Sequence, residues 1–299
     1  MAKRMNAIKE HTRLWVQILF TAVTNGYFYG FATGRIYTGR SKTVCVPGLN
    51  CYSCPGALGS CPIGSLQAVL ANRNYRFSFY VVGFLLLFGS VFGRFVCGWL
   101  CPFGLIQDLL YKIPLFRSRS TERKSLLKRI FTKRKNLPGH RVLIWLKYVI
   151  LAGFVIILPL FALDAIGQGS PWFCKYICPS GTLTAGLPLL VSNEPLRQAA
   201  GFLFQWKVLV LIVLVILSIV VYRPFCKYIC PLGAVYSVFN PIALYRYQID
   251  TNKCTKCGRC KKACKMDIKV WEKPNSPECI RCGDCIRSCP ENAIDRCRR

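Results

Sequence analysis

Two cysteine runs of identical spacing end this sequence and constrain its last 46 residues more than any other feature. Each run has the form Cys-x2-Cys-x2-Cys-x3-Cys, and proline follows the second run. Soft thiolates at this spacing are suited to paired [4Fe-4S] clusters, in which the fourth cysteine of each run binds the cluster of the other run. The spacing therefore predicts two ligand sets. They are Cys254, Cys257, Cys260 and Cys289 for one cluster, and Cys279, Cys282, Cys285 and Cys264 for the other.

Structural zinc and disulfide bonds are the alternative uses of these eight cysteines. Zinc sites are built from two separated Cys-x2-Cys pairs, whereas three cysteines recur at that spacing in each run here. Cysteines this close in sequence are also poorly placed to pair with one another. Lys265 stands where the bacterial pattern has proline after the first run, which leaves the number of ligands unchanged. We therefore expect residues 250–299 to form an α+β domain of the bacterial 2[4Fe-4S] ferredoxin type.

Long apolar stretches fill the remaining chain, residues 1–249. The whole sequence is 53% hydrophobic, with a mean hydropathy of +0.34. Four stretches approach the roughly 20 residues that cross a bilayer core, which predicts an α-helical integral membrane bundle of four transmembrane helices. They are Leu14–Thr33, Phe77–Val96, Val142–Leu163 and Phe202–Tyr222. The first is the weakest, because Thr21, Thr24 and Asn25 favour contacts between helices over contact with lipid.

Basic residues indicate which side of the membrane each loop faces. The formal net charge is +29, and residues 97–141 carry eleven Lys or Arg, whereas residues 167–206 carry two. By the positive-inside rule the first segment is cytoplasmic and the second external, which places both termini in the cytoplasm and the protein in the inner membrane as a multi-pass chain. Residues 34–76, with five basic residues, fit this pattern least well. Because the charge follows the membrane topology, it does not indicate a nucleic-acid partner.

The basic run 117–135 has two interpretations. The first is a topology signal at the anionic inner leaflet. The second is a docking surface for an acidic soluble electron carrier, such as ferredoxin or flavodoxin.

A second motif, Cys-Pro-x-Gly, occurs four times, and three copies have another cysteine four residues earlier. The copies begin at Cys61, Cys101, Cys178 and Cys230, and the earlier cysteines are Cys97, Cys174 and Cys226. Cysteines at i and i+4 share one helical face and can bind one metal centre. Proline suits the first turn of a new helix, and glycine permits close backbone approach. Each motif follows an apolar stretch, which indicates a duplicated two-span unit, about 13–115 and 142–245, with short re-entrant or interfacial helices.

The predicted topology divides these cysteines between the two membrane faces. Four of them gather at the cytoplasmic end and suit a third [4Fe-4S] cluster, with a metal-free redox dithiol as the alternative. They are Cys97, Cys101, Cys226 and Cys230. A possible fourth cluster lies at the external end, where disulfides are the alternative. Its candidates are Cys61, Cys174 and Cys178 with Cys51 or Cys54. Cys45 has no firm role there, and Cys297 lies outside every pattern.

With these motifs the sequence resembles the NapH-like polytopic membrane ferredoxins. That group includes the membrane subunit accompanying periplasmic nitrate reductase, the membrane portion of nitrous oxide reductase maturation proteins, and related cytochrome oxidase assembly ferredoxins. The resemblance rests on Cys97-Gly-Trp-Leu-Cys101-Pro, Cys226-Lys-Tyr-Ile-Cys230-Pro, the four apolar stretches and the two final cysteine runs. It implies electron transfer between a quinone pool or cytoplasmic donors and a partner across the membrane. The external cysteines depart from the family pattern.

Three functions follow from these features. The first is an electron-transfer subunit of an oxidoreductase complex, which would contact the lipid bilayer, other subunits and a soluble carrier. The second is a quinone or quinol oxidoreductase subunit, and the third is a redox assembly factor for a metalloenzyme. The sequence has no Cys-x-x-Cys-His haem motif and no dinucleotide-binding or Walker motif. Ser180-Gly-Thr-Leu-Thr184 only loosely resembles a flavin-attachment sequence, so FMN is not expected, and no catalytic residue is assigned.

Overall fold

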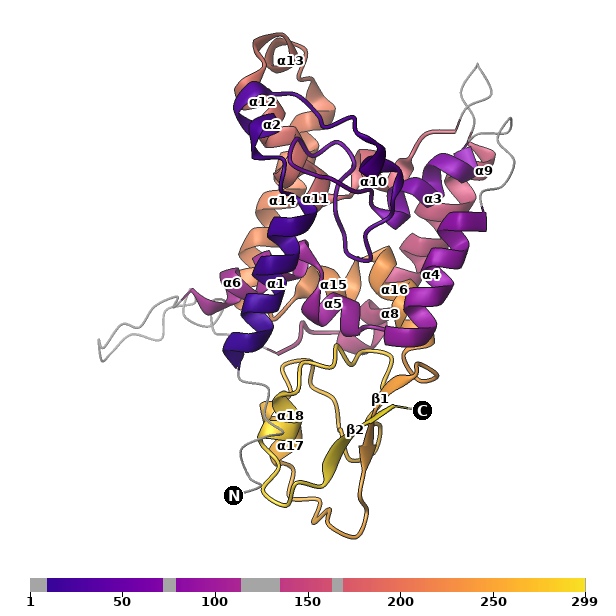
Figure 1. The fold of residues 1–299 in the computed structure, drawn as a ribbon, viewed down its shortest axis with the longest axis vertical. Coiled ribbons are helices and arrows are strands. Elements are labelled where there is room, and N and C mark those ends of the chain that lie inside the picture. The colour runs from indigo at the N-terminus through magenta and orange to yellow at the C-terminus, as the bar shows by residue number, and fades with distance from the viewer. Residues whose placement is uncertain (1–9, 72–78, 114–134, 163–168, 299) are drawn as a thin grey trace, which may run out of the picture.

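The computed structural model describes residues 10–71, 79–113, 135–162 and 169–298. Helical segments stand side by side along the long axis of the molecule, and a small α+β domain lies at one end of them (Figure 1). Most of the basic run 117–135 and the side chain of Cys297 fall outside this description.

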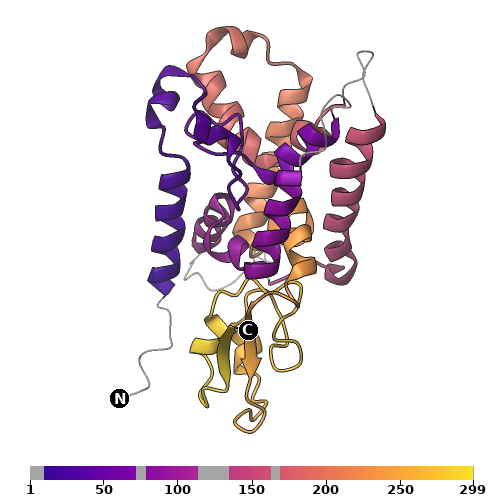
Figure 2. The same ribbon diagram turned by 45° about the vertical axis from the view of Figure 1, so that its right-hand side comes forward.

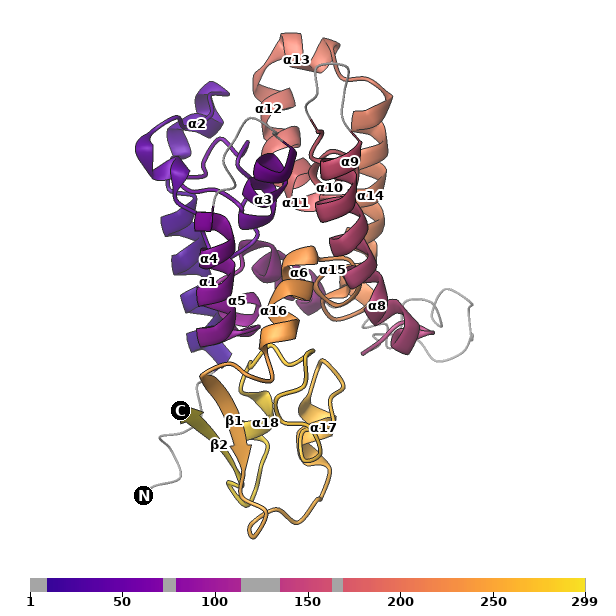
Figure 3. The same ribbon diagram turned by 90° about the vertical axis from the view of Figure 1, so that its right-hand side faces the viewer.

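The upright segments are α1 (Glu10–Thr24), α4 (Phe79–Phe92), α14 (Phe202–Val220) and a continuous stack of three elements. The stack consists of α8 (His140–Ile150), the π-helix η3 (Leu151–Ile157) and α9 (Leu158–Phe161) (Figure 3). Within the described residues, two helices are long and apolar enough to cross a membrane, His140–Phe161 and Phe202–Val220, with mean hydropathies of 2.3 and 2.6. Only 22% and 17% of their most apolar windows are buried inside the protein.

The other two apolar stretches form shorter helices than the sequence predicts. Helix α1 has 15 residues, and α4 has 14 in the part of the chain that the structure describes. Near the end of α1, Thr24 and Asn25 hydrogen-bond to carbonyls of its last turn, and the chain restarts as α2 (Phe28–Thr33). After α4, Gly93 adopts a left-handed conformation with φ 53°, which turns the chain into α5 (Phe95–Trp99). Local backbone chemistry thus breaks each stretch.

Short helices occupy the two halves of the bundle. The half nearer the C-terminal domain contains α5, α6 (Pro102–Lys112), α15 (Pro224–Tyr228) and α16 (Pro231–Phe239). The opposite half contains α2, η2 (Arg40–Thr43), α3 (Pro62–Ala71), α10 (Trp172–Tyr176), α11 (Pro179–Gly181), η4 (Thr182–Gly186), α12 (Leu187–Ser192) and α13 (Glu194–Gln198). One apolar core that includes cysteines from both halves joins them.

The C-terminal domain is an antiparallel strand pair with two short helices. Strand β1 (Tyr245–Ile249) pairs with β2 (Ile294–Arg298), and α17 (Arg259–Ala263) and α18 (Asp284–Arg287) pack together beside them. Strand β1 lies before residue 250, so the fold of this domain extends past the boundary expected from the cysteine spacing. The first turn of α1 lies at the same end of the bundle as this domain (Figure 2).

Hydrogen bonds from side chains to backbone carbonyls hold the C-terminal domain against the bundle. The Arg281 guanidinium donates to the carbonyls of Phe92 and Asn240 at 2.8 and 2.7 Å. In return, the Trp99 indole donates to the Arg281 carbonyl at 3.1 Å. Gly98 packs so closely on the Ile280 carbonyl that a Cβ there would overlap it. The two parts therefore meet where α5 faces the second cysteine run.

Candidate functional site

Four cysteines surround a small cavity at the far tip of the C-terminal domain. This tip group consists of Cys254, Cys257, Cys260 and Cys289. The same four cysteines form one predicted ligand set. Hydrogen bonding from the Arg259 N–H lowers the pKa of Cys257, which favours the thiolate that a metal requires. The Ala293 N–H donates to Cys289 Sγ at 3.3 Å.

A second set of four cysteines lies on the side of this domain that faces the bundle. This junction group consists of Cys264, Cys279, Cys282 and Cys285. Cys285 lies close enough to the other three for electrostatic interaction. The Ile268 N–H donates to Cys264 Sγ at 3.5 Å. The structure therefore brings together the members of the second predicted set as well.

The bundle holds a third group just above the junction. This inner group consists of Cys97, Cys101, Cys226 and Cys230, and all four are buried. Each interacts electrostatically with other members of the group, although the two cysteine pairs come from segments more than 120 residues apart in sequence. These are the same four cysteines that the sequence predicts to gather at one end of the bundle.

Three copies of the Cys-Pro-x-Gly motif share one local structure. Cys101, Cys178 and Cys230 are each the N-cap of a helix whose first residue is proline. In the last copy the Gly233 N–H donates to Cys230 Sγ at 3.3 Å, the usual geometry of an N-cap acceptor. The helix N-terminus also favours negative charge on that sulfur. In this copy the motif therefore positions a thiol and supplies it with a backbone donor.

A fourth group surrounds a cavity of about 760 Å³ in the opposite half of the bundle. This outer group consists of Cys51, Cys61, Cys174 and Cys178, all of which line that cavity. Cys174 interacts electrostatically with the other three. Cys51 Sγ packs beside Gly181, at 3.4 Å from the position that a Cβ would take there.

Cys54 and Cys45 do not line the cavity of the outer group. The Cys54 thiol faces the Asn25 side-chain oxygen at 3.9 Å and lines a different, apolar cavity. The Cys45 thiol lies 3.7 Å from the hydroxyls of Ser60 and Ser65. Of the two sequence candidates, Cys51 lines this cavity and Cys54 does not.

Two buried arginines that belong to neither cysteine motif link the two cysteine pairs of the inner group. Arg223 Nη1 donates to the Cys97 carbonyl at 2.6 Å, and Arg94 Nη2 donates to the Cys226 carbonyl at 2.9 Å. Both side chains are fully buried. Each arginine stands three residues before the first cysteine of an inner motif. That shared offset is the signal that would have found them.

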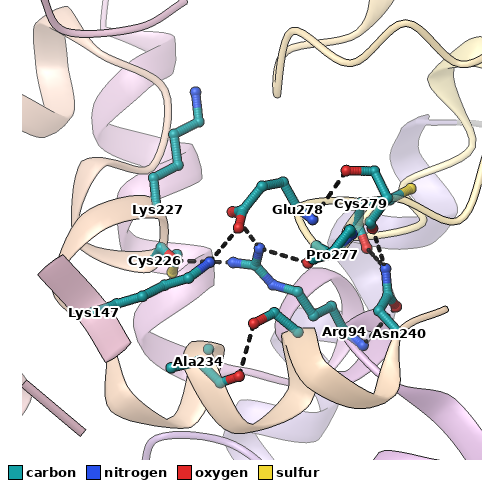
Figure 4. A network of polar contacts seen from close by, with 12 residues as sticks. Arg94, Lys147, Cys226, Lys227, Ala234, Asn240, Pro277, Glu278 and Cys279 are labelled. Carbon is teal, nitrogen blue, oxygen red and sulfur yellow. Dashed lines mark hydrogen bonds and ion pairs between the residues drawn. The ribbon is translucent and has the colours of Figure 1, made fainter. Parts of the chain in front are cut away.

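Each arginine is paired with a carboxylate. Asp108 accepts hydrogen bonds from Arg223 Nε and Nη2 at 2.7 and 2.5 Å, and it also pairs with Arg13. Glu278 accepts from Arg94 Nη1 at 2.6 Å and from Lys147 (Figure 4). Burial alone would raise the pKa of Glu278, but the Arg94 and Lys147 charges outweigh burial and hold its pKa below the ordinary value. Glu278 directly precedes Cys279, so this pair connects the inner and junction groups.

Two side chains lie between neighbouring cysteine groups. Arg94 interacts electrostatically with Cys97 and Cys226 of the inner group, and with Cys279 of the junction group. Tyr236 is fully buried and interacts with Cys61 of the outer group as well as with three inner cysteines. The Tyr236 hydroxyl donates to the Pro47 carbonyl at 3.0 Å, so the loop that contains Pro47 contacts a side chain beside the inner group. The junction, inner and outer groups are therefore consecutive neighbours.

The chemistry of these groups fits polynuclear iron–sulfur centres. All 18 cysteines whose side chains are described are free thiols. Within the same described part of the chain, no three Cys, His, Asp or Glu are placed to hold a single metal ion. Four gathered thiols in each group are the ligand complement of one [4Fe-4S] cluster.

Comparison with known proteins supports the same chemistry. A 4Fe-4S binding domain model matches residues 74–133, 146–193 and 203–243, and a second 4Fe-4S binding domain model matches residues 247–269 and 274–295. No solved structure matches the chain.

Three curated relatives illustrate the range of similar proteins. The uncharacterized protein MJ0750 of Methanocaldococcus jannaschii is 32% identical over 208 residues, which cover 68% of this chain and 72% of the relative. The methylamine utilization ferredoxin-type protein MauN of Methylorubrum extorquens is 28% identical, over 62% of this chain and 50% of MauN. The regulatory protein NosR of Pseudomonas aeruginosa is 24% identical, over 61% of this chain and 21% of NosR.

The chain thus spans half the length of MauN and a smaller share of NosR, whereas it covers most of MJ0750. The segments matched by the two domain models lie between residues 74 and 295. This chain therefore belongs to a family of proteins with 4Fe-4S binding domains that also contains MJ0750.

Proposed function

We propose that this protein is a membrane relay that carries electrons through four [4Fe-4S] clusters. The tip, junction, inner and outer groups would each hold one cluster through four thiolates. When bound, the clusters supply the one-electron chemistry, and the chain supplies ligands, spacing and electrostatics. Electrons would pass between a cytoplasmic carrier at the tip and a donor or acceptor beside the outer group.

The consecutive arrangement of the groups is the observation that carries this proposal. Electron tunnelling slows steeply with distance, so a relay needs neighbouring centres. Arg94 lies between the junction and inner groups, and Tyr236 lies between the inner and outer groups. Because an isolated ferredoxin domain would need only the tip and junction groups, the two bundle groups indicate a longer path.

The exposed apolar surface supports a membrane location. Phe79, Phe161 and Phe202 are 78–80% exposed, and each lies at or near the end of an upright helix. A water-soluble protein seldom exposes such large apolar patches. The two longest helices would cross the bilayer, and α1 and α4 would complete a four-helix, multi-pass bundle beside them. The C-terminal domain and the first turn of α1 would then share the cytoplasmic side.

Transport across a vesicle membrane tests the relay. The full chain would be placed in lipid vesicles with an oxidised dye trapped inside and a membrane-impermeant reductant outside. We expect reduction of the trapped dye, and we expect Cys174→Ser to lower the rate to that of empty vesicles. The control is Cys45→Ser, which removes a thiol that lies outside the outer group. Equal rates for Cys174→Ser and the unaltered protein would rule out the outer group as part of the path.

An apolar cavity favours a second candidate function, quinone or quinol oxidation–reduction. The cavity has a volume of about 490 Å³ and is lined by Pro102, which follows an inner cysteine, and by Ser180, which lies near an outer one. Asn25 and Thr184 provide polar atoms at its wall. Apolar pockets with a few polar groups suit such ring ligands. Cluster reduction by a quinol analogue that is unaffected by Cys174→Ser would favour this function over the relay.

A further inference from the structure

Two buried glutamines occupy equivalent positions beside the inner and outer groups. Gln67 on α3 and Gln107 on α6 each stand six residues after the cysteine of a Cys-Pro-x-Gly motif. Their exposed fractions are 0% and 1%. A long polar side chain buried in an apolar core is costly unless its amide is fully hydrogen-bonded. The hydrogen bonds of both side-chain amides therefore show how the cost of burying them is offset.

The contacts of the two glutamines are the same, atom for atom. Gln107 Nε2 donates to Cys226 Sγ at 3.1 Å, and its Oε1 accepts the Phe225 N–H at 3.2 Å. Gln67 Nε2 donates to Cys174 Sγ at 3.3 Å, and its Oε1 accepts the Phe173 N–H at 3.0 Å. In both cases the amide bridges the first cysteine of a Cys-x3-Cys-Pro motif and the residue before it.

The backbone donor fixes the orientation of each amide. Only the amide oxygen can accept the N–H of Phe225 or Phe173, so the NH₂ group must face the sulfur. The same NH₂ group also donates to the carbonyl four residues earlier, at 3.4 Å for Gln107 and 3.3 Å for Gln67. Each sulfur therefore receives a dedicated N–H donor that a glutamine in the opposite orientation could not supply.

We infer that Gln107 and Gln67 tune the reduction potentials of the inner and outer clusters, respectively. This inference rests on the proposed function. Reduction adds one electron to a cluster and increases the negative charge on its thiolate sulfurs. An N–H donor to a sulfur stabilises the reduced form more than the oxidised form, which raises the potential. The repetition of this contact at two sites indicates a role beyond filling space in the core.

The two groups differ in their other charged neighbours. Buried Arg94 and Arg223 face the inner group, whereas Lys207 faces the outer group and lines its cavity. None of these charged residues is altered in a glutamine variant. A change in potential in a glutamine variant therefore reports the amide itself.

Redox titration followed by EPR on the full chain in detergent tests the inference. In Gln107→Met, which has a similar volume, we expect the reduced-to-oxidised ratio of the inner cluster at a fixed ambient potential to fall about tenfold, equivalent to about 59 mV for a one-electron couple. The other clusters should titrate as before. The matched variant Gln67→Met should shift the outer cluster alone. Cys226→Ser and Cys174→Ser assign the two signals, because each variant removes one ligand.

A second variant separates tuning from folding. Gln107→Glu keeps an oxygen for the Phe225 N–H but replaces the donor that faces the sulfur, so the potential should fall at least as far as in Gln107→Met. Unchanged potentials in both variants, at an iron content equal to that of the unaltered protein, would overturn the inference and leave the relay intact. Loss of about four irons in both variants would overturn it too, because it would show that Gln107 serves assembly. An unaltered protein with no bundle clusters would overturn the proposed function itself.

Discussion

Replacing Glu278 with glutamine is expected to lower the free energy of unfolding by about 3–5 kcal/mol. The reason is that Arg94 and Lys147, both with fully buried side chains, pair with this one carboxylate, itself only 13% exposed. The neutral amide would leave two buried positive charges without a compensating negative charge. Denaturant-induced unfolding of the full chain in detergent, followed by tryptophan fluorescence, measures the change.

The matched control for Glu278 is Glu272→Gln in the same domain. Glu272 pairs with Lys269, and both side chains are about half exposed, at 49% and 54%. Exposed pairs of this kind contribute about 0–1 kcal/mol. Similar losses of stability in the two variants would show that Glu278 is not part of a buried network at the junction.

Replacing Cys51 with serine is expected to remove about four of about sixteen iron atoms per chain, because one cluster loses a ligand. Cys54→Ser should leave the iron content unchanged, although the two residues are only three positions apart. Cys51 lines the cavity of the outer group, whereas Cys54 lines the apolar cavity and faces Asn25. Iron and acid-labile sulfide analysis of anaerobically purified protein measures both variants.

The result for these two cysteines decides the fourth outer ligand. Iron loss in Cys54→Ser with full iron in Cys51→Ser would contradict the placement of the loop. Equal iron in both variants and in the unaltered protein would indicate that the outer thiols hold no cluster.

Local sequence spacing predicted the parts of the site that local backbone geometry determines. The tip group combines three cysteines within one run with Cys289 from the other, as the spacing requires. The Cys-Pro-x-Gly motif likewise predicts a helix start, and Cys101 and Cys230 cap the helices that follow them. In such cases the residues that determine the structure are neighbours in sequence.

Interactions between distant residues could not be predicted in this way. Arg94 and Glu278 are 184 positions apart, and no periodicity relates them. The choice between Cys51 and Cys54 depends on an irregular loop in which Cys54 faces Asn25 and Cys51 lies beside Gly181, both distant in sequence. The lengths of α1 and α4 depend on single residues, such as Gly93 with its left-handed backbone, that a hydropathy window averages out.

The iron content of the intact chain tests the central claim most directly. Anaerobic purification of the full chain from membranes, followed by iron and sulfide analysis with low-temperature EPR, counts the clusters. The relay predicts about 16 iron atoms per chain, four for each of the tip, junction, inner and outer groups. About 8 iron atoms, with signals from the C-terminal domain alone, would contradict the relay and confine the clusters to the two final cysteine runs.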